Sequence, residues 1–311
     1  MENSQSGGKK QHDSKKVVAL DVGGTSISAG VIGIDKSIYP IEPLISPIQQ
    51  AGTRARILNT LVHAANSVKS SVEKLNGIGI AMPGPFDYEK GISLMRHKFE
   101  RLYAQDVKKF LQERIGLPVY FINDAEAFAL GAWWISKPSV PRLFAITLGT
   151  GVGACFLVNG TALRSGSEVP EGGEIWNTPW KGRILEDFIS RRTIEELYRQ
   201  KRKIDPTLPA HDNVKDIAQA ARGGNKEAQQ VFRVFAENIG HSLASHVVSF
   251  HPEIIILGGQ ISKAFDLFGE HASEVLRIQT NFDIPMIQTP LGDATAVVGA
   301  GYHCLKRLGL L

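Results

Sequence analysis

Residues 17–33 read VVALDVGGTSISAGVIG, in which two short apolar runs flank a turn with two glycines. The second run alternates small, polar and apolar residues, which is typical of a strand that returns beside the first. These residues predict a β-hairpin with its turn at Asp21-Val22-Gly23-Gly24-Thr25. Without a Cβ at Gly23 or Gly24, backbone N–H groups could approach phosphate oxygens, and Thr25 adds a hydroxyl donor. An ordinary hairpin turn explains the same residues.

A second stretch, FAITLGTGVGACFLV at residues 144–158, repeats this order of strand, glycine turn and strand. Its turn supplies Gly149, Thr150, Gly151 and Gly153 as further phosphate-binding candidates. Glycines and a threonine in alternation between two strands are harder to explain by turn chemistry alone. The recurrence predicts an internal duplication at the scale of a domain.

Apolar runs of strand length alternate with segments of helical periodicity along the chain. The expected helices include residues 184–201 and 225–250, and a buried strand at 254–257 runs into Gly258-Gly259. This glycine pair either caps a strand-to-helix turn or lets a flat base or ribose approach the backbone. The alternation predicts an α/β fold with largely parallel sheet contacts in two units, with the glycine turns lining a cleft between them.

The chain of 311 residues is long enough for two ordinary domains. We expect a disordered tail at residues 1–16, an N-terminal α/β domain at 17–123 and a C-terminal α/β domain at 124–311. The last helix is expected to pack back on the N-terminal domain.

The pair Asn123-Asp124 follows an apolar strand expected at residues 118–122. A carboxylate at this place can accept the proton of an attacking alcohol, which a phosphate-binding turn cannot do. Both residue types also favour the N-cap of a helix, where the helix dipole would hold Asp124 as an anion. Asp21 stands at a strand end beside a phosphate cradle and is the candidate for orienting Mg²⁺, directly or through water.

Carboxylates follow the second glycine turn in the stretches EGGEIWN (171–177) and LEDF (185–188). Most surface glutamates serve only solubility. A polyol, however, is best held by paired carboxylates beside an amide, because each of its hydroxyls can donate and accept at once. Trp176 and Trp180 could face a sugar ring, but core packing is the expected role of both.

Composition excludes several classes of protein. No apolar run approaches the roughly 20 residues of a membrane span, and residues 1–16 lack the apolar centre of a secretory signal, so we expect a cytoplasmic protein with no membrane partner. The formal net charge is +4, but no basic face with interleaved aromatic residues is visible, so no nucleic-acid partner is expected. Cys155 and Cys304 read as buried free thiols, and no histidine grouping has a metal-ligand spacing, so no zinc site is expected.

The order of these motifs resembles the ROK family (repressor, open reading frame, kinase) of sugar kinases, within the actin-like ATPase superfamily and its ribonuclease H-like fold. The resemblance runs from about Val17 to the C-terminus. It implies that the turns Asp21 to Thr25 and Gly149 to Gly153 hold the phosphates of ATP, and that Gly258-Gly259 lies near the adenosine. It also implies that Asp124 is the general base.

The resemblance assigns the sugar site to positions that match Asn123, Glu174 and Glu186, with Gly84 close to the sugar. Many members carry a histidine three residues after the glutamate that matches Glu174, followed by a zinc-binding cysteine cluster. Here Asn177 occupies the histidine position and no such cysteines follow, so the sugar contact is altered and the preferred sugar stays open. Repressor members carry an N-terminal winged helix-turn-helix, for which about 16 residues before the first strand leave no room.

The expected function is ATP- and Mg²⁺-dependent phosphorylation of a hexose or hexose-like sugar, with glucose to glucose 6-phosphate as the first reaction to test, by a chain that the resemblance suggests is a homodimer. A non-catalytic sugar-sensing protein is one alternative, but such a protein has no need of a base at Asp124. A polyphosphate-dependent sugar kinase is another, which basic residues between 191 and 203 would favour if they lined the donor side.

Overall fold

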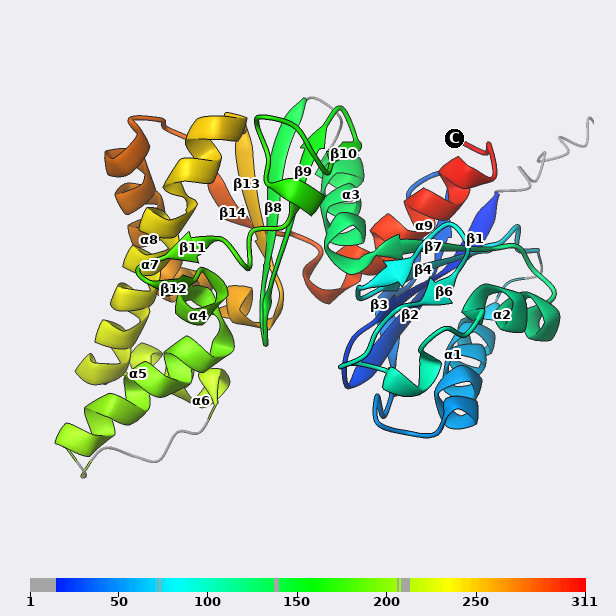
Figure 1. The fold of residues 1–311 in the computed structure, drawn as a ribbon, viewed down its shortest axis with the longest axis horizontal. Coiled ribbons are helices and arrows are strands. Elements are labelled where there is room, and N and C mark those ends of the chain that lie inside the picture. The colour runs from blue at the N-terminus through cyan, green and yellow to red at the C-terminus, as the bar shows by residue number, and fades with distance from the viewer. Residues whose placement is uncertain (1–14, 71, 73, 137–139, 206, 208–212) are drawn as a thin grey trace, which may run out of the picture.

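The computed structural model describes residues 15–70, 72, 74–136, 140–205, 207 and 213–311. Two five-stranded mixed sheets with helices on their faces form the structure (Figure 1), which confirms the α/β fold. Most of the expected disordered tail, residues 1–14, lies outside the described residues, and Lys16 already belongs to the first strand. No helix in the described part of the chain is long and apolar enough to cross a bilayer.

The first sheet has the strand order β3-β2-β1-β4-β7. Its strands are β1 (Lys16–Val22), β2 (Ser26–Gly33), β3 (Ile38–Pro47), β4 (Ile78–Met82) and β7 (Val119–Asn123). β1, β2 and β3 form an antiparallel meander, and β4 and β7 continue the sheet parallel to β1. The hairpin predicted from residues 17–33 is the β1–β2 pair.

The second sheet repeats this plan in the order β10-β9-β8-β13-β14. Its strands are β8 (Arg142–Leu148), β9 (Val152–Val158), β10 (Thr161–Leu163), β13 (Ile254–Gly258) and β14 (Met286–Gln288). An antiparallel meander of three strands is again extended by two parallel strands, so the predicted duplication is confirmed. Two short hairpins complete the strands: β5 (Phe86–Asp87) with β6 (Ile92–Ser93), and β11 (Pro179–Trp180) with β12 (Arg183–Ile184).

The helices connect and cover these sheets. They are α1 (Arg54–Lys69), α2 (Val107–Ile115), α3 (Asp124–Ser136), α4 (Glu186–Ile189), α5 (Arg191–Ile204), α6 (Val214–Arg222), α7 (Lys226–Phe250), α8 (Phe265–Thr280) and α9 (Thr295–Arg307), with short 3₁₀ turns η1 (Glu100–Leu102), η2 (Glu171–Gly173), η3 (Gln260–Ala264) and η4 (Gly292–Ala294). The helix expected at 225–250 is α7. The single helix expected at 184–201 is wrong, because extended Ser190 divides it and the N–H of Arg191 donates instead to Gly149 O at 2.8 Å.

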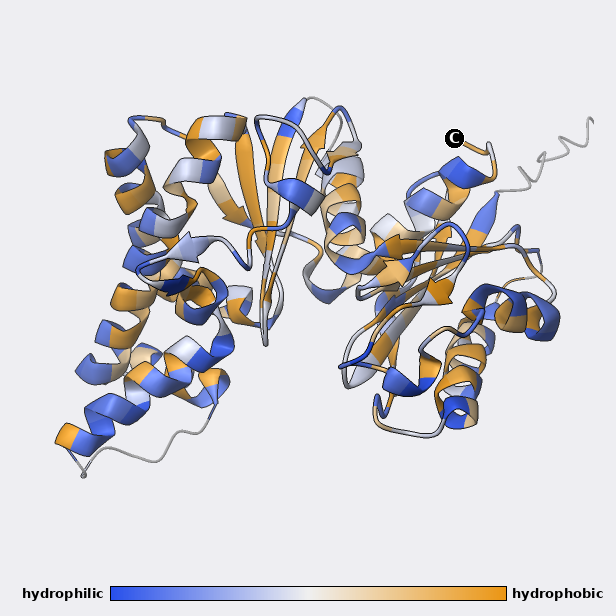
Figure 2. Cartoon of the chain, viewed as in Figure 1, coloured by the Kyte–Doolittle hydropathy of each residue, from blue (hydrophilic) through white to orange (hydrophobic). Residues whose placement is uncertain are grey.

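The central strands of both sheets are buried on both faces, and Figure 2 shows them as largely hydrophobic. In β1, Val18 and Leu20 belong to the core under α1 and α2, whereas Val17 and Ala19 face the core that contains α9. Successive side chains of a strand point to opposite faces. A strand covered on both sides therefore reads as a continuous apolar run.

Helices α3 and α9 pack against each other between the two sheets (Figure 1). α3 follows β7 of the first sheet yet lies on β8 and β9 of the second, and α9 follows the second sheet yet lies on β1 and β4 of the first. The helix backbones approach closely: a Cβ at Gly299 would lie 1.7 Å from Ala127 O, and one at Gly131 would lie 1.9 Å from Thr295 O. These two glycines let the helices, and with them the sheets, meet.

This contact predicts that Gly299→Ala destabilises the protein strongly. The added methyl group overlaps a backbone carbonyl that cannot move without displacing the helix, so we expect the free energy of unfolding to fall by at least about 2 kcal/mol. Urea unfolding measures the change. Gly223→Ala is the matched control, because its Cβ would lie 3.4 Å from the nearest atoms, and its effect should stay below about 1 kcal/mol. Equal stability of the two variants would contradict the close contact.

Candidate functional site

The carboxyl ends of the parallel strands β1, β4 and β7 bring the predicted phosphate and base residues to one edge of the first sheet. Asp21 pairs in register with Ala81, and Met82 pairs with Asn123. The turn that contains Gly84 follows β4 directly. Ligands of open α/β sheets bind beyond the carboxyl ends of parallel strands, so this edge is the candidate site.

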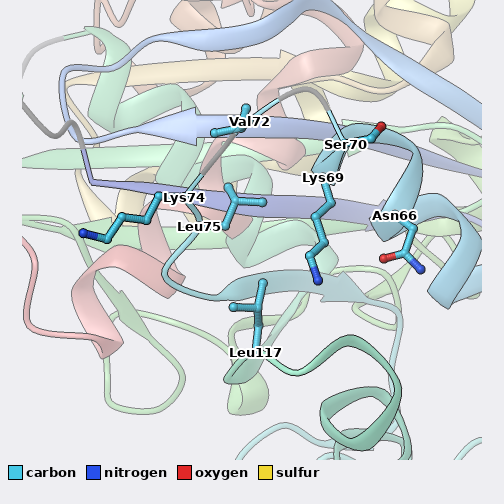
Figure 3. Close-up of a pocket in the computed structure, with 7 residues that line it drawn as sticks. All are labelled: Asn66, Lys69, Ser70, Val72, Lys74, Leu75 and Leu117. Carbon is cyan, nitrogen blue, oxygen red and sulfur yellow. The ribbon is translucent and has the colours of Figure 1, made fainter.

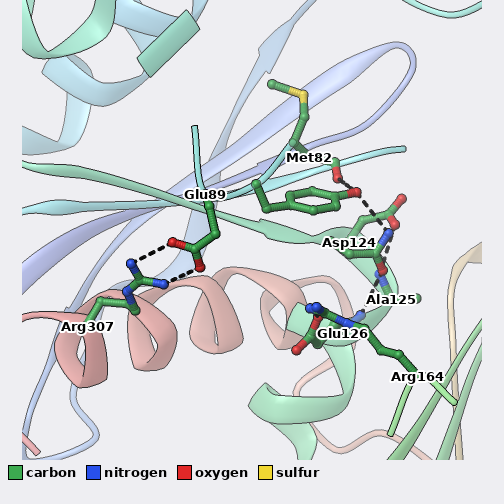
Figure 4. A network of polar contacts seen from close by, with 9 residues as sticks. Met82, Glu89, Asp124, Ala125, Glu126, Arg164 and Arg307 are labelled. Atoms are coloured by element: carbon green, nitrogen blue, oxygen red, sulfur yellow. Dashed lines mark hydrogen bonds and ion pairs between the residues drawn. The ribbon is translucent and has the colours of Figure 1, made fainter. Parts of the chain in front are cut away.

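Asn123 and Asp124 both make local contacts at the start of α3 (Figure 4). Asn123 Oδ1 accepts from Glu126 N at 3.1 Å, and Asp124 Oδ1 accepts from Ala125 N at 2.9 Å. The helix-capping alternative is therefore true of Asn123. Capping also fixes the orientation of this strand-to-helix junction, so it does not exclude a chemical role for Asp124.

Tyr88 extends this network and had no signal in the sequence. Asn123 Nδ2 donates to the Tyr88 hydroxyl at 3.2 Å, and that hydroxyl donates to Met82 O at 3.2 Å (Figure 4). Tyr88 thus connects the end of β4 with the end of β7. A Cβ at Gly84 would lie 3.3 Å from the same hydroxyl, so the Gly84 turn and the Asn123 amide share one neighbour.

The electrostatics of this edge are unusual, because several carboxylates come together. Burial, together with the charges of Asp124 and Asp293, raises the pKa of Asp21 to about 7. Burial also raises the pKa of Asp124, against the lowering effects of the Ala125 N–H and the Lys98 charge, and the charge of Glu174 raises it further. The site therefore holds negative charge that the protein does not fully compensate.

The two glycine turns occupy matching places in the two sheets. In the first turn Gly23, Gly24 and Thr25 are exposed, and the turn is closed by Gly23 N donating to Ser26 O at 2.9 Å. In the second turn, between β8 and β9, Gly149 N donates to Gly151 O at 3.0 Å, and Thr150 is exposed. Exposed turn backbone of this kind is available to a ligand.

Three further glycine positions are explained by packing. Gly153 lies against Ala125, the residue after Asp124. Gly259 has a φ of 82°, and a Cβ there would lie 2.3 Å from Leu148 O. Gly258 likewise leaves space for the ring of Phe128. The Gly258-Gly259 pair therefore brings the end of β13 against the strand that leads into the second glycine turn.

The predicted sugar-binding glutamates have different surroundings. Glu186 Oε2 accepts from Val152 N at 2.8 Å, so this carboxylate is attached to the second glycine turn. Glu174 is exposed and accepts from Trp176 Nε1 at 2.6 Å. Asn177 is also exposed. The expected core packing of Trp176 is wrong: its side chain is 38% exposed and holds the Glu174 carboxylate.

Asp293 is another residue that sequence reasoning missed. It lies in η4, directly before α9, and its carboxylate accepts from Lys263 Nζ at 2.8 Å and Gln260 Nε2 at 3.3 Å. Both partners belong to η3, which follows Gly259. The sequence did contain a signal for Asp293, because Gly292-Asp293 stands just before a segment of helical periodicity.

The described residues contain no group of three or more His, Cys, Asp or Glu side chains placed to hold a metal ion. Cys155 lies in β9 and Cys304 in α9, and both are buried free thiols. Burial raises the pKa of each thiol, which keeps them protonated.

A pocket of about 600 Å³ lies at the end of α1 (Figure 3). It is lined by Asn66, Lys69, Ser70, Val72, Lys74, Leu75 and Leu117. None of the predicted site residues lines it. Lys69 Nζ donates to Ile115 O at 2.9 Å, a contact that joins α1 to the end of α2.

Known proteins share this arrangement of elements. The glucokinase of Thermotoga maritima is 28% identical over 319 aligned residues, which cover 94% of this chain and 98% of the relative. The xylose repressor of Caldicellulosiruptor bescii is 28% identical over 247 residues, covering 72% of this chain and 61% of the repressor. A ROK family glucokinase from Streptomyces griseus, solved with glucose and AMPPNP, superposes with a TM-score of 0.77 at 22% identity, covering 93% and 98% of the two chains.

The likeness to the Streptomyces griseus protein shows the fold, with its two five-stranded mixed sheets, which is the actin-like ATPase fold that the family resemblance implied. A sequence model of the ROK family matches residues 17–306. The match spans both glycine turns, the Asn123-Asp124 pair and the segment up to α9. The chain therefore belongs to the ROK family.

Proposed function

We propose that the chain is an ATP-dependent hexose kinase that acts in the cytoplasm, with glucose as its first candidate substrate and glucose 6-phosphate as the product. The observation that carries this proposal is the position of Asp124, at the edge of the first sheet where β1, β4 and β7 end, beside Asp21 and the exposed first glycine turn. A glucokinase among its relatives supports the choice of sugar.

In this proposal Asp124 accepts the proton of the primary hydroxyl as it attacks the transferring phosphoryl group. The raised pKa of Asp124 suits this role, because a base works best when its pKa lies closer to the working pH. Asn123, Glu174 and Glu186 orient the sugar, with Gly84 and Asn177 beside it. Capping of α3 by Asn123 fixes where the base lies relative to the sugar.

The residues at this edge fit a nucleotide with a divalent cation. Burial, and after it the charges of Asp124 and Asp293, raise the pKa of Asp21. A cation beside Asp21 would stabilise its charged form, and Asp21 is the proposed contact to Mg²⁺, directly or through water. The exposed turns Asp21 to Thr25 and Gly149 to Gly153 would hold the phosphates, with Gly258-Gly259 near the adenosine. When bound, ATP supplies the phosphoryl group and Mg²⁺ neutralises charge on its oxygens.

Ion pairs support ATP over polyphosphate as the donor. Arg191 N donates to Gly149 O, which brings the start of α5 to the second turn. The charges of Arg191 and Arg192 are however balanced, by Glu195 at 3.7 Å and by Asp187. A polyanion of many phosphates needs unbalanced cations. Formation of sugar phosphate from hexoses, amino sugars and N-acetyl sugars, measured with ATP and with polyphosphate as donors, tests the proposal, and with ATP the same turnover releases ADP.

We expect Asp124→Asn to lower kcat by roughly a hundred-fold or more, because the amide keeps the shape and removes the base. Sugar binding, measured by calorimetry, should largely survive. The matched control is Asp106→Asn, at the N-cap of α2, since asparagine caps a helix as well as aspartate and its turnover should not change.

Near-normal turnover of a folded Asp124→Asn variant would refute the assignment of the base. Sugar binding by the unchanged protein without turnover of any sugar in the screen would instead favour a non-catalytic sugar sensor. Size-exclusion chromatography of the same sample tests the proposed homodimer.

Asp21→Asn should stabilise the protein at alkaline pH. The folded-state pKa of about 7 lies above the ordinary 3.8 of an aspartate, so the folded state binds more protons and the unchanged protein loses stability between these values as pH rises. The variant lacks this loss. Without divalent ions, its gain in Tm over the unchanged protein should therefore be larger at pH 8 than at pH 5. An equal gain at both values would contradict the buried charge at Asp21.

The two glutamates should differ in their effects on substrate affinity. Removal of a charge-assisted hydrogen bond to a sugar hydroxyl costs about 1.5–3 kcal/mol, so Glu174→Gln should raise the sugar KM roughly ten-fold or more. The KM for ATP should change little. Glu186→Gln should raise both constants, because Glu186 also holds Val152 N in the second turn. An unchanged sugar KM in both variants would place the sugar elsewhere.

A further inference from the structure

The first turn of α3 carries an ion pair that the proposed chemistry does not use. Arg164 Nη2 donates to Glu126 Oε2 (Figure 4). Glu126 lies two residues after Asp124, and Arg164 is the first residue after β10. The Glu126 side chain is only 16% exposed, whereas that of Arg164 is 63% exposed. A largely buried carboxylate at the start of the base-carrying helix thus has its partner on a surface loop.

That loop, residues 164–173, closes on itself. Gly173 has a φ of 70°, and a Cβ there would lie 2.7 Å from Leu163 O, so the two ends of the loop touch. Val169 in its middle is buried in the core of the second sheet, and Glu168 pairs with Arg142 at 3.1 Å. The loop is therefore a compact body attached to the second sheet, as in other surface loops whose ends meet.

Glu174 follows this loop directly, and Ile175 after it is fully buried. Burial is the main cause of the raised pKa of Asp124, and the charge of Glu174 raises it further. The two carboxylates therefore interact electrostatically. Glu126 N is in turn bonded to Asn123. The ion pair therefore connects two short segments, one that ends in Glu174 and one that begins with Asn123-Asp124.

We propose that the Arg164–Glu126 ion pair is a positioning contact, which holds the 164–173 loop against the start of α3 and so sets the place of Glu174 relative to Asp124. The inference rests on the proposed function for its consequence in catalysis. The tethering of the loop by this pair does not depend on that function.

Charge-changing variants can separate two effects of the pair, the tethering of the loop and the direct influence of its charges on Asp124. Arg164→Gln removes the tether and also leaves a buried carboxylate beside Asp124. Arg164→Lys keeps the charge. The double variant Glu126→Arg with Arg164→Glu exchanges the two charges and restores the ion pair. If the pair acts by holding the loop, this variant should behave like the unchanged protein. If the charge of residue 126 instead acts directly on Asp124, the effect should change sign.

Hydrogen exchange measured by mass spectrometry tests the tether without reference to activity. Arg164→Gln should speed amide exchange in residues 165–173 by roughly three-fold or more, because a local contact that opposes opening is lost. Arg164→Lys and the reversed pair should return exchange toward that of the unchanged protein. The matched control is Arg222→Gln, which breaks an ion pair with Asp266 between α6 and α8 and should leave the loop unchanged.

Steady-state kinetics test the consequence. Because a partly exposed ion pair is worth up to about 1 kcal/mol, Arg164→Gln should raise the sugar KM roughly three- to five-fold, with kcat and the KM for ATP nearly constant. Unchanged exchange in Arg164→Gln, or no rescue by the reversed pair, would overturn the inference whatever the protein's activity. Faster exchange in a protein that phosphorylates no sugar would uphold the tether and refute the proposed function instead.

Discussion

The close contact of α3 with α9 is the constraint on which the rest of the structure depends. Each helix follows one sheet in the sequence and packs on the other sheet. The two halves of the duplicated fold are therefore joined by these two crossing helices. The absence of a Cβ at Gly131 and Gly299 lets the backbones touch. Ala125, the residue after Asp124 in the first turn of α3, lies against Gly153 of the second glycine turn. The base candidate therefore lies where both sheets contribute.

This junction gathers negative charge at a cost in stability. Asp21, Asp124 and Asp293 come from β1, α3 and η4, three segments far apart in the sequence. Burial and the neighbouring carboxylates raise the pKa of Asp21 to about 7. Carboxylates held in this way destabilise a fold unless a ligand or cation stabilises their charge. Proximity of these like charges therefore supports the proposed site for a nucleotide and its cation.

The elements predicted from local patterns agree with the structure where a single segment decides the outcome. The β1–β2 hairpin, the duplicated hairpin at β8–β9 and α7 each follow from the periodicity and turn residues of one stretch. The errors arise where a distant segment intervenes. Ser190 breaks the expected helix because the next N–H bonds to Gly149, and Trp176 stays partly exposed because its indole holds Glu174. The boundary of the two expected domains between residues 123 and 124 stays a prediction.

The sequence by itself determined the two glycine-turn hairpins, the strands that lead into Asn123 and Gly258, the Asn123-Asp124 pair and membership of the ROK family, because each depends on residue types at short spacings. Only the tertiary structure decided which of these residues meet. Tyr88 on Asn123, Glu186 on Val152 and Arg164 on Glu126 are contacts between segments that are 34 to 38 residues apart. Such pairs depend on strand register and on the crossing of α3 and α9, since no local pattern encodes the distance between two separate segments.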